Sequence, residues 1–197
     1  MKKILFLLLG FYPSIICYSQ SSLEYLERGV AKGNLKDYRG AIADFTRAIE
    51  INPKFLEAYK DRGIERERLQ DYEGAIEDFN KALEINPEDA EVYFNRGICK
   101  ADQQDYQGAI TDYNKALEIN PKYGDAYFNR GFAKGELQDF RGAISDYSKS
   151  IEIDPQRTDA YFNRGNLKED LRDYKGAIED YSKAVEIDSK FGGAYLN

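Results

Sequence analysis

A chain of 197 residues has room for one domain or two small ones, and its 42% of hydrophobic residues, with 16 Tyr and 11 Phe, excludes a disordered polymer. The sequence contains no histidine, which excludes a Ser-His-Asp triad, a Cys-His pair and a histidine-bearing zinc site. The 28 basic and 35 acidic residues give a net charge of -7, which argues against a nucleic-acid partner.

The N-terminal segment, residues 1–19, has the layout of a secretory signal peptide. Lys2 and Lys3 form a basic start, and residues 4–11 are almost wholly apolar. Cys17 and Ser19 place small residues before a cut at Gln20. The segment therefore predicts an exported protein, periplasmic or secreted from a bacterium, with the signal cleaved near Ser19.

Two alternatives for this segment remain open. An uncleaved segment would act as an anchor and would be the chain's one contact with a membrane. Pro13 and Ser14 interrupt its apolar run, however, and that run is shorter than the roughly 20 residues of a spanning helix. Alternatively, Cys17 could be the lipidated first residue, although Ile15 and Ile16 are bulky for a lipoprotein signal.

The rest of the chain repeats with a period of 34 residues. Residues 22–191 form five blocks without insertion or deletion, and this period is typical of a solenoid of helix-turn-helix units. The blocks are residues 22–55, 56–89, 90–123, 124–157 and 158–191. Residues 192–197 match the start of a sixth, truncated block. Positions within a block are numbered from 1 to 34.

Four positions carry the same kind of residue in every block. Position 4 is aromatic: Tyr25, Tyr59, Tyr93, Tyr127 and Tyr161. Position 8 is small: Gly29, Gly63, Gly97, Gly131 and Gly165. Position 20 is small: Ala41, Ala75, Ala109, Ala143 and Ala177. Position 24 is aromatic: Phe45, Phe79, Tyr113, Tyr147 and Tyr181. Small residues let two helices approach closely, and aromatic residues fill the space around them.

This pattern resembles the tetratricopeptide repeat (TPR) family over the full length of the five blocks. The resemblance implies an all-α fold, a right-handed superhelical solenoid of stacked antiparallel helix pairs, and a function in protein binding. One position departs from the family pattern. Position 7, usually apolar, is arginine in every block: Arg28, Arg62, Arg96, Arg130 and Arg164.

Three polar positions make structural predictions. The aspartate at position 16, as in Asp105, is suited to cap the second helix of its block. The glycine at position 19, as in Gly108, is interpreted as a site of close backbone packing. The arginine at position 7 and the aspartate at position 23 occur together, as in Arg96 and Asp112, and predict a partly buried bridge between the two helices.

The candidate binding site lies on the first helices, whose positions 2, 5, 6, 9, 12 and 13 line the concave surface in the family. Asparagine at position 6 can hold an extended peptide, since its amide offers donors and an acceptor to a peptide backbone. Positions 5 and 9 add apolar patches. The predicted partner-binding residues are Phe94, Asn95, Ile98, Phe128, Asn129, Phe132, Phe162, Asn163 and Asn166. Two alternatives remain: a solvated stripe copied by duplication, and a packing role for the phenylalanines.

The sequence predicts no catalytic residue, metal site, cofactor or small-molecule substrate. Cys99 is interpreted as a packing residue, because no histidine is present to activate its thiol. Acidic residues at position 2, such as Glu91 and Asp125, favour a neutral to basic protein or peptide partner. The sequence thus predicts a non-catalytic interaction scaffold. The alternative is the N-terminal TPR region of a longer enzyme or envelope machine.

Overall fold

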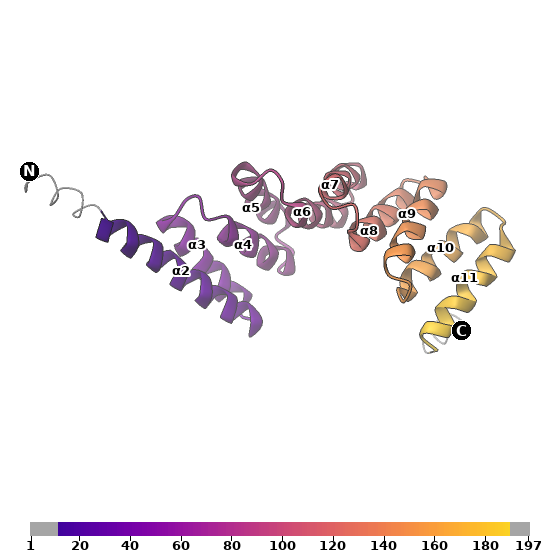
Figure 1. Ribbon diagram of the computed structural model, residues 1–197, viewed down its shortest axis with the longest axis horizontal. Helices are drawn as coiled ribbons and strands as arrows, with labels where there is room; N and C mark the ends of the chain where they lie inside the picture. Colours follow the sequence, from indigo (N-terminus) through magenta and orange to yellow (C-terminus); the bar gives the residue numbers. More distant parts are fainter. Residues whose placement is uncertain (1–11, 190–197) are drawn as a thin grey trace, which may run out of the picture. The chain divides into compact units, whose positions relative to one another are not determined.

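The computed structural model describes residues 12–189, and these residues form helices joined by short turns, with no β-strand among them (Figure 1). The helices are α2 (Tyr12–Asn34), α3 (Tyr38–Ile51), α4 (Leu56–Arg68), α5 (Tyr72–Ile85), α6 (Ala90–Asp102), α7 (Tyr106–Ile119), α8 (Gly124–Glu136), α9 (Phe140–Ile153), α10 (Thr158–Asp170) and α11 (Tyr174–Ile187). Each block contributes a first helix and a second helix.

The helices fall into two compact units. The first unit holds α2–α5 and the second holds α6–α11. Within each unit, consecutive helices pack on one another, and α2 contacts α4 as α6 contacts α8. The predicted all-α class, built from consecutive helix pairs, is confirmed.

The ends of the chain bear on two of the sequence predictions. Residues 1–11 of the predicted signal lie outside the described residues, and α2 begins at Tyr12 and continues through Ser19 and Gln20. The start of the predicted sixth block, residues 192–197, also lies outside them. Between residues 12 and 189, no helix is both long enough and apolar enough to cross a membrane.

The turn between the two helices of a block has the same geometry in all five blocks. The residue at position 15, such as Gln104, has a positive φ of 62–63°. The following aspartate then caps the second helix: the Asp105 Oδ1 accepts a hydrogen bond from the Gly108 backbone N–H at 3.0 Å. The predicted aspartate cap is therefore confirmed. The same cap forms at Asp37, Asp71, Asp139 and Asp173.

The interpretation of the glycine at position 19 as a site of close backbone packing is wrong. A methyl group on Gly108 would lie 2.1 Å from the Asp105 Oδ2. The crowding thus comes from the capping carboxylate, which folds back over the first turn of the helix. A residue with a Cβ at this position would therefore require the Asp105 carboxylate to shift.

The core of each block is built around the aromatic residue at position 24. Phe79 and Tyr113 are almost completely buried. A methyl group on Gly97 would lie 2.6 Å from the Tyr113 ring, so the glycine at position 8 makes room for this ring. Burial also raises the pKa of the Tyr113 phenol. The small and aromatic positions therefore pack as the sequence predicts.

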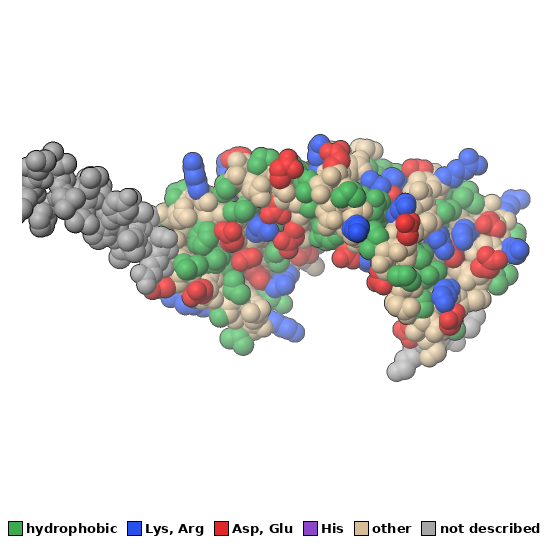
Figure 2. Space-filling view, viewed as in Figure 1, with side chains coloured by type: hydrophobic (Ala, Val, Ile, Leu, Met, Phe, Trp, Pro, Cys, Tyr) green, Lys and Arg blue, Asp and Glu red, His purple; other side chains and the backbone are tan. Residues whose placement is uncertain are grey.

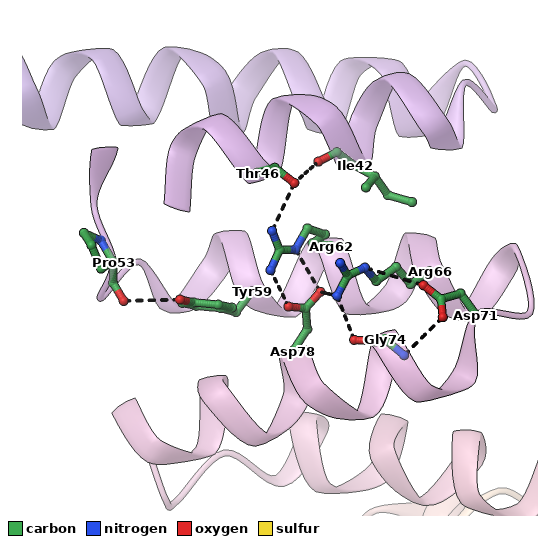
Figure 3. A network of polar contacts seen from close by, with 9 residues as sticks. All are labelled: Ile42, Thr46, Pro53, Tyr59, Arg62, Arg66, Asp71, Gly74 and Asp78. Atoms are coloured by element: carbon green, nitrogen blue, oxygen red, sulfur yellow. Dashed lines mark hydrogen bonds and ion pairs between the residues drawn. The ribbon is translucent and has the colours of Figure 1, made fainter. Parts of the chain in front are cut away.

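A buried carboxylate links the two helices of each block, and Figure 3 shows this contact for the block of α4 and α5. Arg62 donates from Nε and NH2 to the two oxygens of Asp78, at 2.9 and 2.6 Å, and Asp78 is almost fully buried. The predicted arginine–aspartate pair is confirmed. The corresponding pairs in the other blocks are Arg28–Asp44, Arg96–Asp112, Arg130–Asp146 and Arg164–Asp180.

Two further contacts of this carboxylate network were not predicted. Arg66, at position 11, donates to the Asp78 Oδ2 at 2.8 Å, so each buried aspartate holds two cations. The remaining guanidinium nitrogen of Arg62, Nη1, donates at 3.0 Å to the hydroxyl of Thr46, which belongs to the preceding block (Figure 3). Arg62 thus joins three helices of the first unit. In the second unit, Arg130 reaches Asn114 and Arg164 reaches Ser148 in the same way.

The network makes stability depend on pH. The hydrogen bond from Arg28 lowers the pKa of Asp44 from 3.8 to about 2, against the opposing effect of burial, and Lys32 adds to the lowering. Because the folded-state pKa is below the unfolded value, the ionised Asp44 stabilises the fold fully above about pH 4. That contribution is lost as the pH falls from about 4 to about 2.

We expect Asp44→Asn to lower the free energy of unfolding at about pH 6, where wild-type Asp44 is ionised. The difference from wild type should shrink between about pH 4 and pH 2, because the wild-type carboxyl becomes neutral as well. Denaturant unfolding at several pH values measures this difference. Glu50→Gln, which changes an exposed pair with Arg47, serves as control and should have little effect at any pH. A difference for Asp44→Asn that stays constant across this range would contradict the pairing.

Candidate functional site

The predicted binding residues all lie in the second unit, on the first helices α6, α8 and α10. Positions 2, 6, 9 and 13 are spaced by four, three and four residues, so they share one face of each helix. We call these residues the first-helix stripes. They are Glu91, Asn95, Ile98 and Asp102 on α6; Asp125, Asn129, Phe132 and Glu136 on α8; and Asp159, Asn163, Asn166 and Asp170 on α10. Each stripe has a carboxylate at both ends and an amide inside.

The asparagines of the stripes are half-buried, and some have internal hydrogen bonds. The Asn129 Nδ2 donates to the Asp125 carbonyl oxygen at 2.9 Å, on the same helix. Burial raises the pKa of Tyr147 to about 12, and a hydrogen bond from Asn163 opposes this rise. The Asn166 Oδ1 accepts from the Tyr181 hydroxyl at 2.8 Å. A primary amide has two donor hydrogens and an acceptor oxygen, so one internal bond leaves capacity for a partner.

The phenylalanines at position 5 pack inside their own blocks. Phe94 lies 5.9 Å from Tyr113 and 4.7 Å from Tyr123, measured between ring centroids. Phe128 and Phe162 contact the rings at position 24 of their blocks in the same way, at 5.4 and 5.7 Å. These three rings are half-buried and contribute to packing. Their contact with a partner stays a prediction.

The apolar residues at position 9 differ in exposure. Ile98 packs against the cluster that contains Ala109, Ile110 and Tyr113. Phe132 remains 43% exposed and meets Tyr106 edge-on at 6.3 Å. Phe132 is therefore the aromatic side chain that α8 presents to solvent on this face.

Arg157 also lies in this region, although the repeat pattern does not predict it as a site residue. Its guanidinium lies 4.0 Å above the centre of the Phe128 ring. The same group pairs with Asp125 and, at 3.1 Å, with Asp159. Arg157 thus covers Phe128 and offsets the acidic residues at position 2 of α8 and α10. Position 34 is Phe55, Asp89 and Tyr123 in the earlier blocks. The change to arginine at this position is the one feature of the sequence that could have pointed to Arg157.

The carboxylates at position 13 form a second set, at the last residue of each first helix. Asp102, Glu136 and Asp170 are exposed. The pKa of the Tyr106 phenol is raised by burial, and then by the charge of Glu136 and a hydrogen bond with it. Glu136 therefore lies beside the half-buried Tyr106, whose ring meets the exposed Phe132.

The described residues contain no group of three histidine, cysteine, aspartate or glutamate side chains that could hold a metal ion. Cys99 is fully buried on α6, which agrees with its interpretation as a packing residue. The arrangement on this face offers amides, one exposed ring and carboxylates, which are groups that bind other chains through hydrogen bonds and charge. Figure 2 shows that acidic, basic and hydrophobic side chains are interspersed over the surface in view.

Family comparisons match most of the repeat region. Models described as "Tetratricopeptide repeat" match residues 90–123 and 158–191, and residues 25–55 and 124–157. A model described as "TPR repeat" matches residues 68–99. No curated protein matches the chain.

Solved structures share the fold. MamA is 26% identical, with a TM-score of 0.79, over 84% of this chain and 96% of that one. YrrB, described as a TPR protein with an unusual peptide-binding site, is 22% identical, with a TM-score of 0.75, over 91% of this chain and 92% of its own. PilF of Pseudomonas aeruginosa is 19% identical, with a TM-score of 0.77, over 86% of this chain and 77% of its own.

Proposed function

Because the chain belongs to the tetratricopeptide repeat family, we propose that it is a non-catalytic scaffold that binds an extended peptide or a partner protein across α6, α8 and α10. The observation that carries this proposal is the row of three asparagines, Asn95, Asn129 and Asn163, at the same position of three successive first helices. Their regular spacing suits a ligand whose hydrogen-bonding groups also repeat, as those of an extended backbone do.

The surroundings of the three amides support a peptide ligand. The exposed ring of Phe132 lies one turn along α8 from Asn129, where it can contact an apolar side chain of the ligand. The rings beneath the amides are fixed by packing, so the face is preorganised and binding would order few of its side chains. The family resemblance points the same way, since YrrB shows that this fold can carry a peptide-binding site.

We expect the double variant Asn95→Ala/Asn129→Ala to bind selected peptides about tenfold more weakly than wild type. Each lost amide contact should cost on the order of 0.5 to 1.5 kcal/mol, while the melting temperature stays unchanged because neither amide joins two helices. The probes are peptides selected from a phage-displayed library of random dodecamers, with affinities measured by fluorescence anisotropy. Asn163 is left intact because it hydrogen-bonds Tyr147.

Gln107→Ala is the matched control for this measurement, since Gln107 is an exposed amide on the second helix α7. It should leave peptide affinity as it is in wild type. The proposal fails if the library yields no ligand, or if the selected peptides bind the double variant as tightly as wild type. A lowered melting temperature of the double variant would instead assign the amides to packing.

We further propose that the scaffold works outside the cytoplasm, on the strength of the basic start and apolar core of residues 1–19. Expression of the whole chain in a Gram-negative host should give a periplasmic protein whose mass corresponds to a start at Gln20. Leu8→Arg, which interrupts the apolar core, should keep the chain unprocessed in the cytoplasm. Wild-type protein that retains Met1 in the cytoplasm would contradict export, and retention of Met1 in the membrane would contradict cleavage.

A further inference from the structure

One side of α11 is mostly apolar and open to solvent. It carries four residues spaced four, four and three apart, which places them on one side of the helix: Tyr174, Ile178, Ser182 and Val185. We call these four residues the α11 face. Tyr174 is 59% exposed, Ile178 is 64% exposed and Val185 is 44% exposed. Among residues 12–189, no helix follows α11 in the chain.

The equivalent side of α7 is covered by α8, the first helix of the next block. Ile110 and Leu117 of α7, which correspond to Ile178 and Val185, are buried. Ala133 of α8 belongs to the same cluster as Ile110. Ala126 belongs to the same cluster as Leu117, and Tyr127 packs against that cluster. A first helix thus covers this side through an alanine at position 3, an aromatic residue at position 4 and an apolar residue at position 10.

A polar contact also joins a first helix to the second helix before it. The Arg164 Nη1 donates at 2.9 Å to the Ser148 hydroxyl of α9, and that hydroxyl donates at 2.7 Å to the Ile144 carbonyl oxygen. The Ser182 hydroxyl of α11 makes the same bond to the Ile178 carbonyl oxygen, also at 2.7 Å. Because a hydroxyl has a single donor hydrogen, exposed Ser182 is oriented as an acceptor. The α11 face therefore has the acceptor that an incoming arginine uses on α9.

Helix α2 lacks one of the features of a first helix that would fit this face. Position 3 is Glu24 on α2, and this side chain is exposed. At the same position the other first helices bury small residues completely: Ala58, Ala126 and Ala160. Docking of α2 from a second copy would place the Glu24 carboxylate against Val185, which is costly without a cation beside it. The α11 face thus suits a first helix with alanine at position 3, which α2 of a second copy does not offer.

From these observations we propose that the α11 face binds an amphipathic helix of another protein. The contact side of that helix carries alanine, an aromatic residue, arginine and an apolar residue at positions i, i+1, i+4 and i+7. Its arginine donates to Ser182, and its apolar residues cover Ile178 and Val185. In this chain α10 has the same pattern: Ala160, Tyr161, Arg164 and Leu167. The site differs from the first-helix stripes in its location and takes a helix, whereas the stripes take an extended peptide.

The test uses the whole chain labelled with ¹⁵N and a synthetic peptide with the sequence of residues 155–171, which contains α10. The peptide carries Gly165→Lys, and a lactam bridge joins this lysine to Glu169, because a helix of this length is marginal in water. Gly165 and Glu169 both lie beside Tyr181 of their own block, so the bridge points away from the side that packs on α9. We expect the peptide to shift the amide signals of α11 and to leave those of the stripes unchanged.

The arginine–serine contact is tested by a cycle between chain and peptide. Ser182→Ala in the chain should weaken binding about fivefold, and so should Arg164→Ala in the peptide, as expected for one hydrogen bond from a charged donor. The two substitutions together should cost no more than either alone, because both remove the same bond. Losses that add up fully would overturn this contact.

The apolar part of the α11 face is tested by Ile178→Ser. This variant should bind the peptide at least tenfold more weakly, while its melting temperature stays that of wild type because Ile178 is exposed. Leu137→Ser is the matched control, since Leu137 is an exposed leucine at the end of α8, and it should leave binding unchanged. A lowered melting temperature of Ile178→Ser with unchanged binding would assign the face to packing within the chain and overturn the proposal.

Three further outcomes separate the possible occupants. A peptide with Ala160→Glu, which copies Glu24 of α2, should not bind, and binding as tight as that of the parent peptide would admit a second copy and overturn the choice of partner. Self-association of the chain that is lost in Ile178→Ser would do the same. No shift in α11 with the parent peptide would overturn the proposal. The double variant Asn95→Ala/Asn129→Ala should bind this peptide like wild type, so this inference and the proposed function can fail separately.

Discussion

The structure of each block depends on the ion pairs that the buried aspartate at position 23 forms with the facing helix. A carboxylate removed from water is costly unless cations and hydrogen bonds surround it, and Asp78 meets this requirement with Arg62 and Arg66 of the facing helix. Any rotation or sliding of one helix against the other would separate these groups. The ion network therefore selects one register for the helix pair, while the aromatic ring at position 24, as in Phe79 and Tyr113, is buried in the core of the block.

The same network also determines which charges remain on the surface proposed to bind a partner. Arg130 and Lys134 turn toward Asp146, while Asp125 and Glu136 remain on the outside of the same helix. Helix α8 has as many basic as acidic residues, yet its exposed charges are acidic because its basic residues point into the block. Asn129 hydrogen-bonds only within its own helix, whereas Asn163 and Asn166 bond tyrosines of neighbouring helices. Substitution of Asn95 and Asn129 can therefore alter binding while the core of the block stays intact.

Much of this fold could be predicted from the sequence because its determinants recur every 34 residues. The cap at Asp105 and the pair of Arg96 with Asp112 follow from residue type and helix geometry alone. The second cation, Lys100, was visible as a recurrent base but was missed, since spacing does not say which way a flexible side chain turns. The role of Gly108 was misjudged because the folded-back carboxylate depends on the turn conformation.

The candidate site was less accessible to prediction than the fold. Helical spacing places Asn95, Asn129 and Phe132 on one face, but it could not show that Phe128 is covered by Arg157, which lies at the far end of the same block. Side-chain direction at position 5 is set by packing against the ring at position 24, which the sequence pattern does not encode. The amides and carboxylates are therefore the groups of the candidate site that a partner could reach, and the phenylalanines at position 5 pack beneath them.

The central claim, that the buried aspartate couples the two helices of a block, is tested most directly by a double-mutant cycle on Arg130 and Asp146. Their atoms meet at 2.6 and 2.8 Å across α8 and α9. Denaturant unfolding of wild type, Arg130→Ala, Asp146→Ala and the double variant gives the coupling energy. We predict a coupling of at least about 1 kcal/mol, with the double variant less destabilised than the sum of the single variants. Strictly additive losses would contradict the claim.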